Sequence, residues 1–180
     1  MTHVLVLMGG NSAEREVSLR TGNEVSKSLN KLGFYVTKLD PKKESLSKIT
    51  KISPDIIFNA LHGKFGEDGI VQGVLETFKI PYTHSGVLAS SLAMDKIFSK
   101  KIFESSGIQC TIGEVFFLND FSNQEYIDYP YVIKPINEGS SFGVRIIHNE
   151  EDKLKFINNS DWHYGKKILV EKFVPGKELT

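Results

Sequence analysis

The sequence lacks the features that define several classes of protein. Its one cysteine, Cys110, excludes an internal disulfide and a cysteine-based zinc site, and it favours a reducing compartment. Lysine plus arginine and aspartate plus glutamate each number 22, so no net charge attracts nucleic acid or an anionic membrane. No apolar run is long enough to span a bilayer, and residues 3–8 are too few for a signal-peptide core. We therefore predict a cytoplasmic protein that binds neither nucleic acid nor membrane.

In the first half of the chain, short apolar runs alternate with segments of helical periodicity. Four runs are predicted to form strands: residues 4–8, 34–39, 55–61 and 81–83. One helix begins near Asn11, where Glu14 suggests a capping box, and ends at Gly33; a second covers residues 68–78. This alternation predicts an α/β domain over residues 1–94, with a parallel sheet covered by helices on both faces.

The second half of the chain has a different pattern. Four further strands are predicted at residues 113–118, 131–135, 143–148 and 167–173. A helix over 85–106 ends at Gly107, and another covers 150–158. We place the boundary near residue 95 and predict an antiparallel α+β domain over residues 95–180. The last residues stop after a turn, as a further strand begins, so we expect a truncated protein.

The segment from residue 62 to residue 73 is the most informative of the chain. A buried strand delivers His62 into a loop with glycines at 63, 66 and 69, and a helix begins near Asp68. Glycine allows backbone conformations that let loop N–H groups face a ligand closely. Ligands of parallel sheets collect at this edge, so the loop is a candidate binding site.

A second candidate loop follows the apolar strand that ends at Lys134. The sequence Glu138-Gly-Ser140-Ser141-Phe-Gly143 combines hydroxyls and backbone N–H groups that can hold a phosphate, while the lysine supplies positive charge. No GxxxxGK[ST] motif is present. The loop also satisfies G-x-S-x-G, but a strand-like run follows it where a hydrolase needs a helix, so we reject a serine hydrolase.

Each charged candidate also has a purely structural explanation. Glu14 could stabilise a helix N-terminus, and His62 could be a hydrogen-bonded structural residue. Lys134 could be an outward lysine on an edge strand, next to a proline, and Lys96 a solvated helix lysine. Composition and spacing leave these explanations open.

Together the three motifs resemble those of the D-alanine–D-alanine ligases, which are ATP-grasp enzymes. The residues that carry the likeness are 9–18, 62–73, and Lys134-Pro followed by 138–143. The resemblance extends over residues 4–180. It implies a Rossmann-like, pre-ATP-grasp substrate domain over 1–94, followed by the first lobe of an ATP-grasp fold over 95–180, without the C-terminal lobe.

The resemblance also implies roles for individual residues. Glu14 would hold the ammonium group of the first D-alanine, His62 would lie near its reacting carboxylate, and Ser140 would join the network around Glu14. We expect the two loops to face one crevice. The residues expected to bind ATP, by side chain or backbone, are Lys96, Lys134, Glu138, Ser140, Ser141, Glu171, Lys172, Phe173, Val174 and Glu178.

The implied reaction is ATP-dependent joining of two D-alanines to D-alanyl-D-alanine through an acyl phosphate, for peptidoglycan synthesis. Mg²⁺ or Mn²⁺ would take part, but its ligands in the family would lie beyond residue 180, so no metal ligand is expected in this chain. The resemblance implies a homodimer. We expect the chain by itself to be inactive as a ligase. The alternatives are a non-catalytic fragment that binds a nucleotide or a partner, and a related ligase such as a D-alanine–D-lactate ligase.

Overall fold

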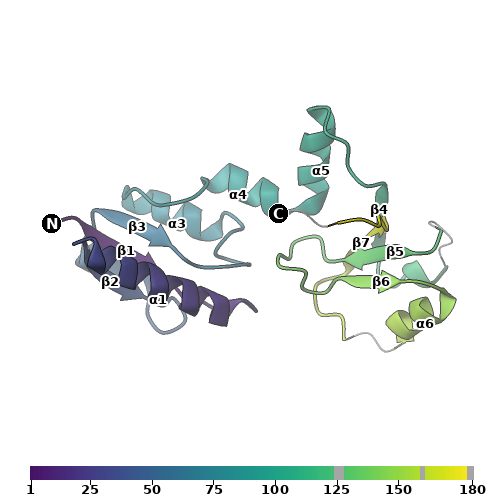
Figure 1. The fold of residues 1–180 in the computed structure, drawn as a ribbon, viewed down its shortest axis with the longest axis horizontal. Helices are drawn as coiled ribbons and strands as arrows, with labels where there is room; N and C mark the ends of the chain where they lie inside the picture. The colour runs from purple at the N-terminus through teal and green to yellow at the C-terminus, as the bar shows by residue number, and fades with distance from the viewer. Residues whose placement is uncertain (124–127, 159–160, 178–180) are drawn as a thin grey trace. The chain divides into compact units, whose positions relative to one another are not determined.

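The computed structural model describes residues 1–123, 128–158 and 161–177. The chain divides into two compact units, Met1–Met94 and Asp95–Thr180 (Figure 1). The first unit contains β1 (His3–Leu7), α1 (Arg15–Lys31), β2 (Tyr35–Leu39), the 3-10 helix η1 (Leu46–Lys48), α2 (Ile49–Ile52), β3 (Ile56–Asn59), α3 (Ile70–Phe78) and α4 (Val87–Met94). The second contains α5 (Lys96–Ser105), β4 (Gly113–Phe117), the 3-10 helix η2 (Phe121–Asn123), β5 (Tyr131–Lys134), β6 (Arg145–Ile147), α6 (Glu150–Asn158) and β7 (Lys167–Lys172).

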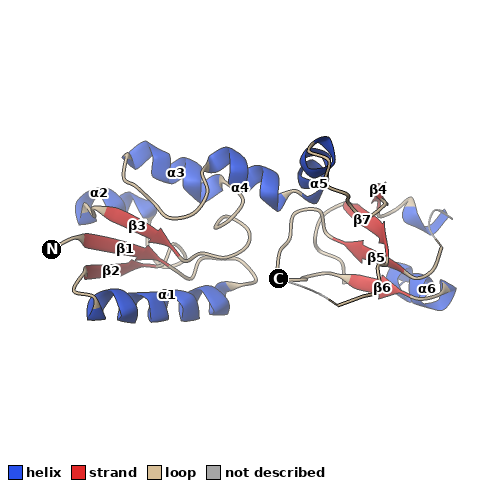
Figure 2. Cartoon of the chain, turned by 45° about the horizontal axis from the view of Figure 1, so that its top comes forward, coloured by secondary structure: helices blue, strands red, loops and turns tan. Residues whose placement is uncertain are grey.

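The first unit is built on a parallel sheet, as predicted, and its strand order is β2-β1-β3. Alternate residues of β1 face opposite sides of this sheet. Leu5 and Leu7 pack with Val71 and Leu75 of α3, whereas Val6 belongs to a second buried cluster on the side of α1. Figure 2 shows α1 on one face of the sheet and α2 and α3 on the other. Both faces of the central strand β1 are therefore buried, which explains its continuous apolar sequence from Val4 to Leu7.

Two details of the first unit correct the sequence prediction. Helix α1 begins at Arg15, and Glu14 at its N-cap makes no side-chain cap hydrogen bond, so the capping box from Asn11 is wrong. Ser12 takes over part of that role, because its Oγ accepts the Glu14 N–H at 3.2 Å. The predicted strand at 81–83 is reduced to one isolated parallel bridge between Ile57 and Tyr82. Pro81 has no N–H with which to extend the ladder.

The helix predicted over residues 85–106 is two helices, α4 and α5. The break lies at Asp95, whose backbone is extended and whose carboxylate accepts hydrogen bonds from the N–H groups of Ile97 and Phe98. Aspartate is a strong N-cap residue, since it satisfies N–H groups that have no partner within the helix. The helical periodicity on both sides concealed this cap.

The second unit contains an antiparallel sheet, again as predicted, and its strand order is β4-β7-β5-β6. One face carries an apolar cluster that includes Phe121, Tyr131, Ile133, Ile168 and Val170. Phe156 and Ile157 of α6 pack against this cluster, and Figure 2 shows α6 beside the sheet. The residues that alternate with these on β5 and β7 therefore project from the opposite face.

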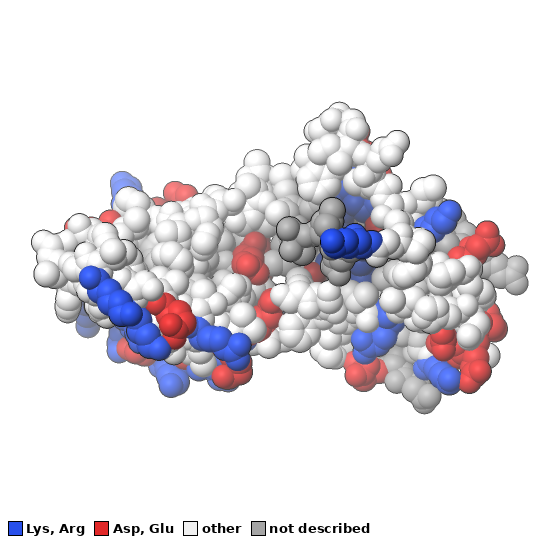
Figure 3. Space-filling view, in the orientation of Figure 1, with Lys and Arg blue, Asp and Glu red and all other residues white. Residues whose placement is uncertain are grey.

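The surface carries charges of both signs. Figure 3 shows lysine and arginine side chains interspersed with aspartate and glutamate over the face drawn. No helix among the described residues is long and apolar enough to cross a lipid bilayer.

Candidate functional site

The turn after β1 is fixed by a pair of oppositely charged side chains. Arg15 and Asp40 form an ion pair of 2.6 Å, and both side chains are mostly buried. Arg15 Nη1 also donates to the Gly10 carbonyl at 2.8 Å, and the Gly10 N–H donates to Asp40 Oδ1 at 3.0 Å. The Gly9 N–H donates to Ser18 Oγ at 2.8 Å. This network orients the start of α1, where Glu14 lies.

The hydrogen bond from Arg15 lowers the pKa of Asp40 from its ordinary value of 3.8 to about 2, with help from the N–H groups of Gly10 and Lys42. The folded-state pKa is therefore below that of the unfolded chain. The ionised carboxylate stabilises the folded chain above pH 3.8, and this stabilisation is lost as the pH falls towards 2.

We expect Asp40→Asn to lower the free energy of unfolding by about 1 to 2 kcal/mol at neutral pH, after allowing for screening by solvent. The difference from the unsubstituted chain should shrink between pH 4 and pH 2. Urea unfolding at a series of pH values measures both effects. Glu24→Gln, which removes the exposed ion pair with Lys27, is the control and should change little. A difference that stays constant from pH 6 to pH 3 would contradict the assignment.

Glu14 is a buried carboxylate at the N-cap of α1. Its Oε2 occupies the space that a Cβ at position 63 would fill, so Gly63 makes room for it. Gly63 also has a φ of +65°, which favours glycine. The structure thus places Glu14 directly against the loop that carries His62, 48 positions further along the chain.

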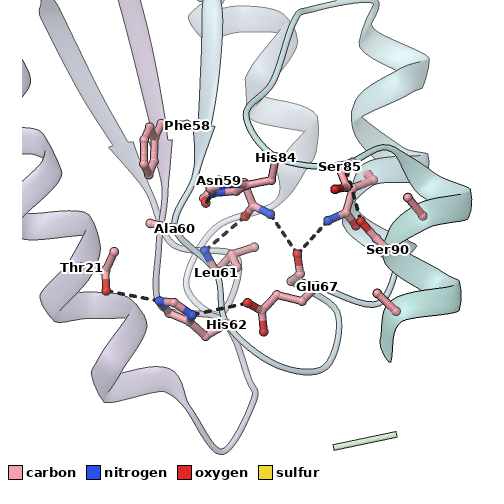
Figure 4. Close-up of a pocket in the computed structure, with 14 residues that line it drawn as sticks. Thr21, Phe58, Asn59, Ala60, Leu61, His62, Glu67, His84, Ser85 and Ser90 are labelled. Carbon is pink, nitrogen blue, oxygen red and sulfur yellow. Dashed lines mark hydrogen bonds and ion pairs between the residues drawn. The ribbon is translucent and has the colours of Figure 1, made fainter. Parts of the chain in front are cut away.

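His62 is held from both sides of its ring (Figure 4). Its Nε2 lies 3.2 Å from Thr21 Oγ1, and its Nδ1 lies 3.6 Å from Glu67 Oε1. Glu67 is fixed in turn, because its Oε2 accepts the Gly63 N–H at 2.6 Å. Ser12 Oγ donates to the His62 carbonyl at 2.7 Å. The ring is therefore oriented by partners from α1 and from its own loop.

Two buried amide side chains hold the glycine loop in shape. Asn59 Nδ2 and Gln72 Nε2 both donate to the Gly66 carbonyl at 2.9 Å (Figure 4). Gly66 lies close to Leu61, and a Cβ there would come within 2.6 Å of the Leu61 Cβ. The loop borders a cavity of about 400 Å³, which His62, Glu67 and Gln72 help to line. The rest of the lining mixes apolar side chains such as Phe58 and Leu61 with polar ones such as His84 and Ser90, as in a small-molecule site.

In the second unit, Lys134 ends β5 and contacts Glu171 of β7. Val132 is opposite Glu171 and Lys134 is opposite Leu169, so Lys134 and Glu171 are diagonal neighbours on one face of the sheet. Lys134 Nζ pairs with Glu171 Oε2. The edge-strand explanation for Lys134 is wrong, because β5 lies between β7 and β6.

Lys96 starts α5 and reaches the second candidate loop. Its Nζ donates to the Glu138 carbonyl at 2.5 Å and lies 3.4 Å from the Ile136 carbonyl. Burial lowers the pKa of Lys96, and the positive charge of Lys134 lowers it further. Lys96 is thus not the solvated helix lysine that its sequence position suggested, and it lies near enough to Lys134 for their charges to interact.

The loop between β5 and β6 has an unusual backbone. Ser140 and Ser141 have φ values of +46° and +60°, a conformation that non-glycine residues rarely adopt. Gly143, at +72°, is buried, and a Cβ there would collide with the rings of Pro135 and Tyr164. Strand β6 follows, with no helix, so the structure agrees with rejection of the hydrolase motif.

The family resemblance implies that the backbone of residues 171–174 would hold the adenine of ATP, and this segment is only partly open to a ligand. The Lys172 N–H donates to the Ile112 carbonyl at 2.9 Å, and the Phe173 N–H donates to the Pro130 carbonyl at 3.3 Å. Adenine contacts from residues 171–174 would therefore use other backbone groups. Val174 is exposed, and Glu178 lies outside the described residues.

Two family models match the chain: that described as the D-ala D-ala ligase N-terminus over residues 36–85, and that described as the D-ala D-ala ligase C-terminus over residues 117–180. The D-alanine–D-alanine ligase of Brucella anthropi is 48% identical over 181 residues, which is 99% of this chain and 58% of the relative. The chain belongs to the D-alanine–D-alanine ligase family. It spans about 58% of the length of this curated relative.

Solved structures support the same assignment. The crystal structure of the D-alanine–D-alanine ligase from Bacillus anthracis has a TM-score of 0.81 and 33% identity, covering 98% of this chain and 59% of that one. The complex of the same enzyme with ATP gives a TM-score of 0.78 and 31% identity, over 98% and 60% of the two chains. The VanG D-Ala:D-Ser ligase from Enterococcus faecalis gives 0.76 and 25%, over 97% and 63%. The predicted ATP-grasp fold of this ligase family is confirmed.

The residues of this family member that we describe do not fit a magnesium site. No group of three or more His, Cys, Asp or Glu side chains in the described ranges could hold a metal ion. The buried carboxylate nearest to the second loop, Glu171, already accepts from two ammonium groups, those of Lys134 and Lys100. No step of the proposed reaction therefore uses a metal held by these residues.

Sequence analysis of this ligase family member missed the side chains that orient the candidate site. Asn59, Thr21 and Lys100 lie outside the motifs, and Gln72 lies within residues 62–73 without an expected role. The signal available for Gln72 was its polarity at a core position of an amphipathic helix, since a buried amide needs a partner. For Thr21 and Lys100, the partners His62 and Glu171 lie 41 and 71 positions away, and the Asn59 contact with Gly66 depends on how the glycine loop folds.

Proposed function

We propose that this chain supplies the D-alanine-binding and ATP-binding parts of a ligase that makes D-alanyl-D-alanine for peptidoglycan synthesis. One observation carries the proposal: Lys96, Lys134 and Lys100 gather around the buried carboxylate of Glu171, beside the loop that contains Ser140. Glu171 is shared by two of these ammonium groups, and Glu138 and Asp95 also act on Lys96, so the three lysines form a cluster of cations that is complementary to a nucleotide polyphosphate. The names of the relatives support D-alanine as the substrate.

In the proposed reaction, the terminal phosphoryl group of ATP passes to a carboxylate oxygen of the first D-alanine. The products of this step are an acyl phosphate and ADP. The amine of the second D-alanine attacks the acyl carbon, loses a proton, and phosphate leaves as the peptide bond forms. Lys134 and Lys96 would neutralise charge on the phosphates, and the N–H groups and hydroxyls of residues 138–141 would hold them.

The first unit would bind the first D-alanine. The Glu14 carboxylate is suited to pair with its ammonium group, because it is buried and its position is fixed by Gly63. His62 would orient the reacting carboxylate of the substrate, since its own ring is held by Thr21 and Glu67. Ser140 is proposed as a further substrate-site residue on the basis of the family resemblance.

A hybrid enzyme tests this proposal. Residues 1–180 would replace the matching 58% of the Brucella anthropi ligase, followed by the remainder of that relative. We expect ATP-dependent phosphate release and D-alanyl-D-alanine formation with Mg²⁺ and D-alanine, at a rate within about tenfold of the parent enzyme. The 180-residue chain by itself is the comparison and should release no phosphate. A folded hybrid that binds ATP without making dipeptide would favour the non-catalytic fragment.

In the hybrid, Glu14→Gln should raise the KM for the first D-alanine by about tenfold to a hundredfold. The neutral amide keeps the size of the side chain but loses an ion pair worth about 1.5 to 3 kcal/mol. The KM for ATP should change little. Glu16→Gln, at an exposed position two residues further along the chain, is the matched control. An effect confined to ATP would contradict the role of Glu14.

The acceptor of the reaction is the second part of the proposal that needs a test. One similar structure is named a D-Ala:D-Ser ligase, so a relative with this fold is named for an acceptor other than D-alanine. The hybrid, supplied with D-alanine and either D-serine or D-lactate, would report which portion of the chain sets this choice.

Homodimer formation belongs to the same proposal, and sedimentation of the 180-residue chain measures it.

A further inference from the structure

Lys100 is a partly buried lysine that no motif accounts for. It lies in α5, one turn after Lys96, and its side chain is 18% exposed. Its Nζ pairs with Glu171 Oε1 at 2.5 Å and also donates to the Thr111 carbonyl. Burial of a lysine is costly unless its charge is paired, so this position has a specific use for the ammonium group.

Glu171 divides its two oxygens between two lysines. Oε1 contacts Lys100 of α5, whereas Oε2 contacts Lys134 of β5. The Glu171 side chain is 7% exposed, and Gly113 on the neighbouring strand gives it room, because a Cβ there would lie 2.5 Å from the Glu171 Cγ. With one ammonium group on each oxygen, neither lysine is required to neutralise the carboxylate by itself.

We propose that Lys100 is a positioning residue, which neutralises Glu171 so that the ammonium group of Lys134 remains available for a nucleotide phosphate. The proposal rests on the proposed function of Lys134 as a phosphate ligand. Without Lys100, Lys134 would be the remaining close counter-ion of a buried carboxylate. A phosphate that approached Lys134 would then meet a negative charge that is only half compensated.

The charges of the group give the direction of the effect. Lys96, Lys100 and Lys134 contribute three positive charges and Glu171 one negative charge, and the carboxylates of Glu138 and Asp95 also act on Lys96. Loss of Lys100 makes the net charge of the group more negative by one unit, in a partly buried site where charges interact more strongly than in water. Removal of the Glu171 charge in the same chain restores the original sum. A double substitution therefore separates a charge effect from a structural one.

A purely structural role for Lys100 predicts a different result. Lys100 joins α5 to Thr111 and to β7, so its loss could loosen the packing of the helix. That damage would remain, or increase, when Glu171 also lost its charge. Restored binding in the double variant is thus a readout that a structural role would not produce.

The experiment uses the 180-residue chain, with ADP as the probe and ¹⁵N–¹H NMR titration as the measurement, because this method detects weak binding and shows whether each variant is folded. Lys100→Met should weaken ADP binding by about tenfold. Lys100→Met combined with Glu171→Gln should return the affinity to within about threefold of the unsubstituted chain. Lys101→Met, the neighbouring exposed lysine, is the control.

Three results would overturn the inference about Lys100, and only one of them would also overturn the proposed nucleotide site. If Lys100→Met binds ADP like the unsubstituted chain, or if the double variant binds no better than Lys100→Met, Lys100 does not act through the Glu171 charge and the proposed nucleotide site stands. If the unsubstituted chain shows no ADP-dependent change, the nucleotide site itself is wrong, and the role of Lys100 with it. If Lys100→Met fails to fold, the double variant and Lys100→Arg, which keeps the charge, replace it in the test. Weakened ADP binding in a folded double variant rejects the inference.

Discussion

Replacement of Lys134 by alanine should weaken ADP binding to this chain by about one to two orders of magnitude. A charge-assisted hydrogen bond to a phosphate is worth about 1.5 to 3 kcal/mol, and its loss also removes one of the positive charges around Glu171. The effect should be larger than that of Lys100→Met, because Lys134 would touch the phosphate and Lys100 would not. NMR titration with ADP measures both variants on one scale.

The same substitution should leave the fold intact. Removal of one partner of a buried ion pair commonly costs about 3 to 5 kcal/mol, because a charge is left uncompensated. Here Glu171 keeps Lys100 as a partner, so the loss of stability should be smaller. Lys155→Ala, which removes an exposed lysine paired with Glu151, is the control for the change of side chain. Unchanged ADP affinity in a folded Lys134→Ala chain would remove the phosphate role.

Replacement of Gly69 by alanine should cost about 3 kcal/mol or more of the free energy of unfolding. Gly69 has a φ of +90°, which costs an L-residue about 1 to 3 kcal/mol. A Cβ would also collide with Ser91 Oγ and lie 2.7 Å from the Val87 carbonyl oxygen. The serine side chain could turn away, but the carbonyl belongs to the backbone of α4 and cannot move without it.

Gly73→Ala is a matched control for this prediction. Gly73 lies within α3, and apart from its chain neighbours and the helix's own backbone nothing lies within 4 Å of the position of its missing Cβ. Alanine should therefore stabilise the chain by about 0.5 to 1 kcal/mol, because it forms helix better than glycine. Urea unfolding, followed by circular dichroism, compares the two variants. Equal effects at the two positions would mean that the close approach of α4 to Gly69 has little energetic weight.

The sequence was sufficient to predict the sheets because their burial leaves a local signature. Continuous apolar runs such as residues 4–8 indicate strands buried on both faces, and the alternation with helices then indicates parallel pairing. The break at Asp95 was missed for the opposite reason. A cap is a local choice of backbone angle, and helical periodicity on both sides of it gives the same pattern as one long helix.

The glycine loop and Lys134 could be selected from the sequence because each follows an apolar strand at the ligand-binding edge of a sheet. Their supports could not be selected in this way. Lys100 and Glu171 are 71 positions apart, and Asn59 and Gln72 meet at the Gly66 carbonyl through folding of the loop between them. Contacts of this kind depend on the tertiary structure, which a pattern of neighbouring residues does not contain.

The Glu14 carboxylate fits into the space beside Gly63, so natural selection on position 14 should be coupled to selection on position 63. A mutation that gave position 63 any side chain would displace the acid, even though the acid itself was untouched. Lineages that retain glutamate at position 14 should accordingly keep glycine at 63, and those that abandon one should show relaxed selection on the other.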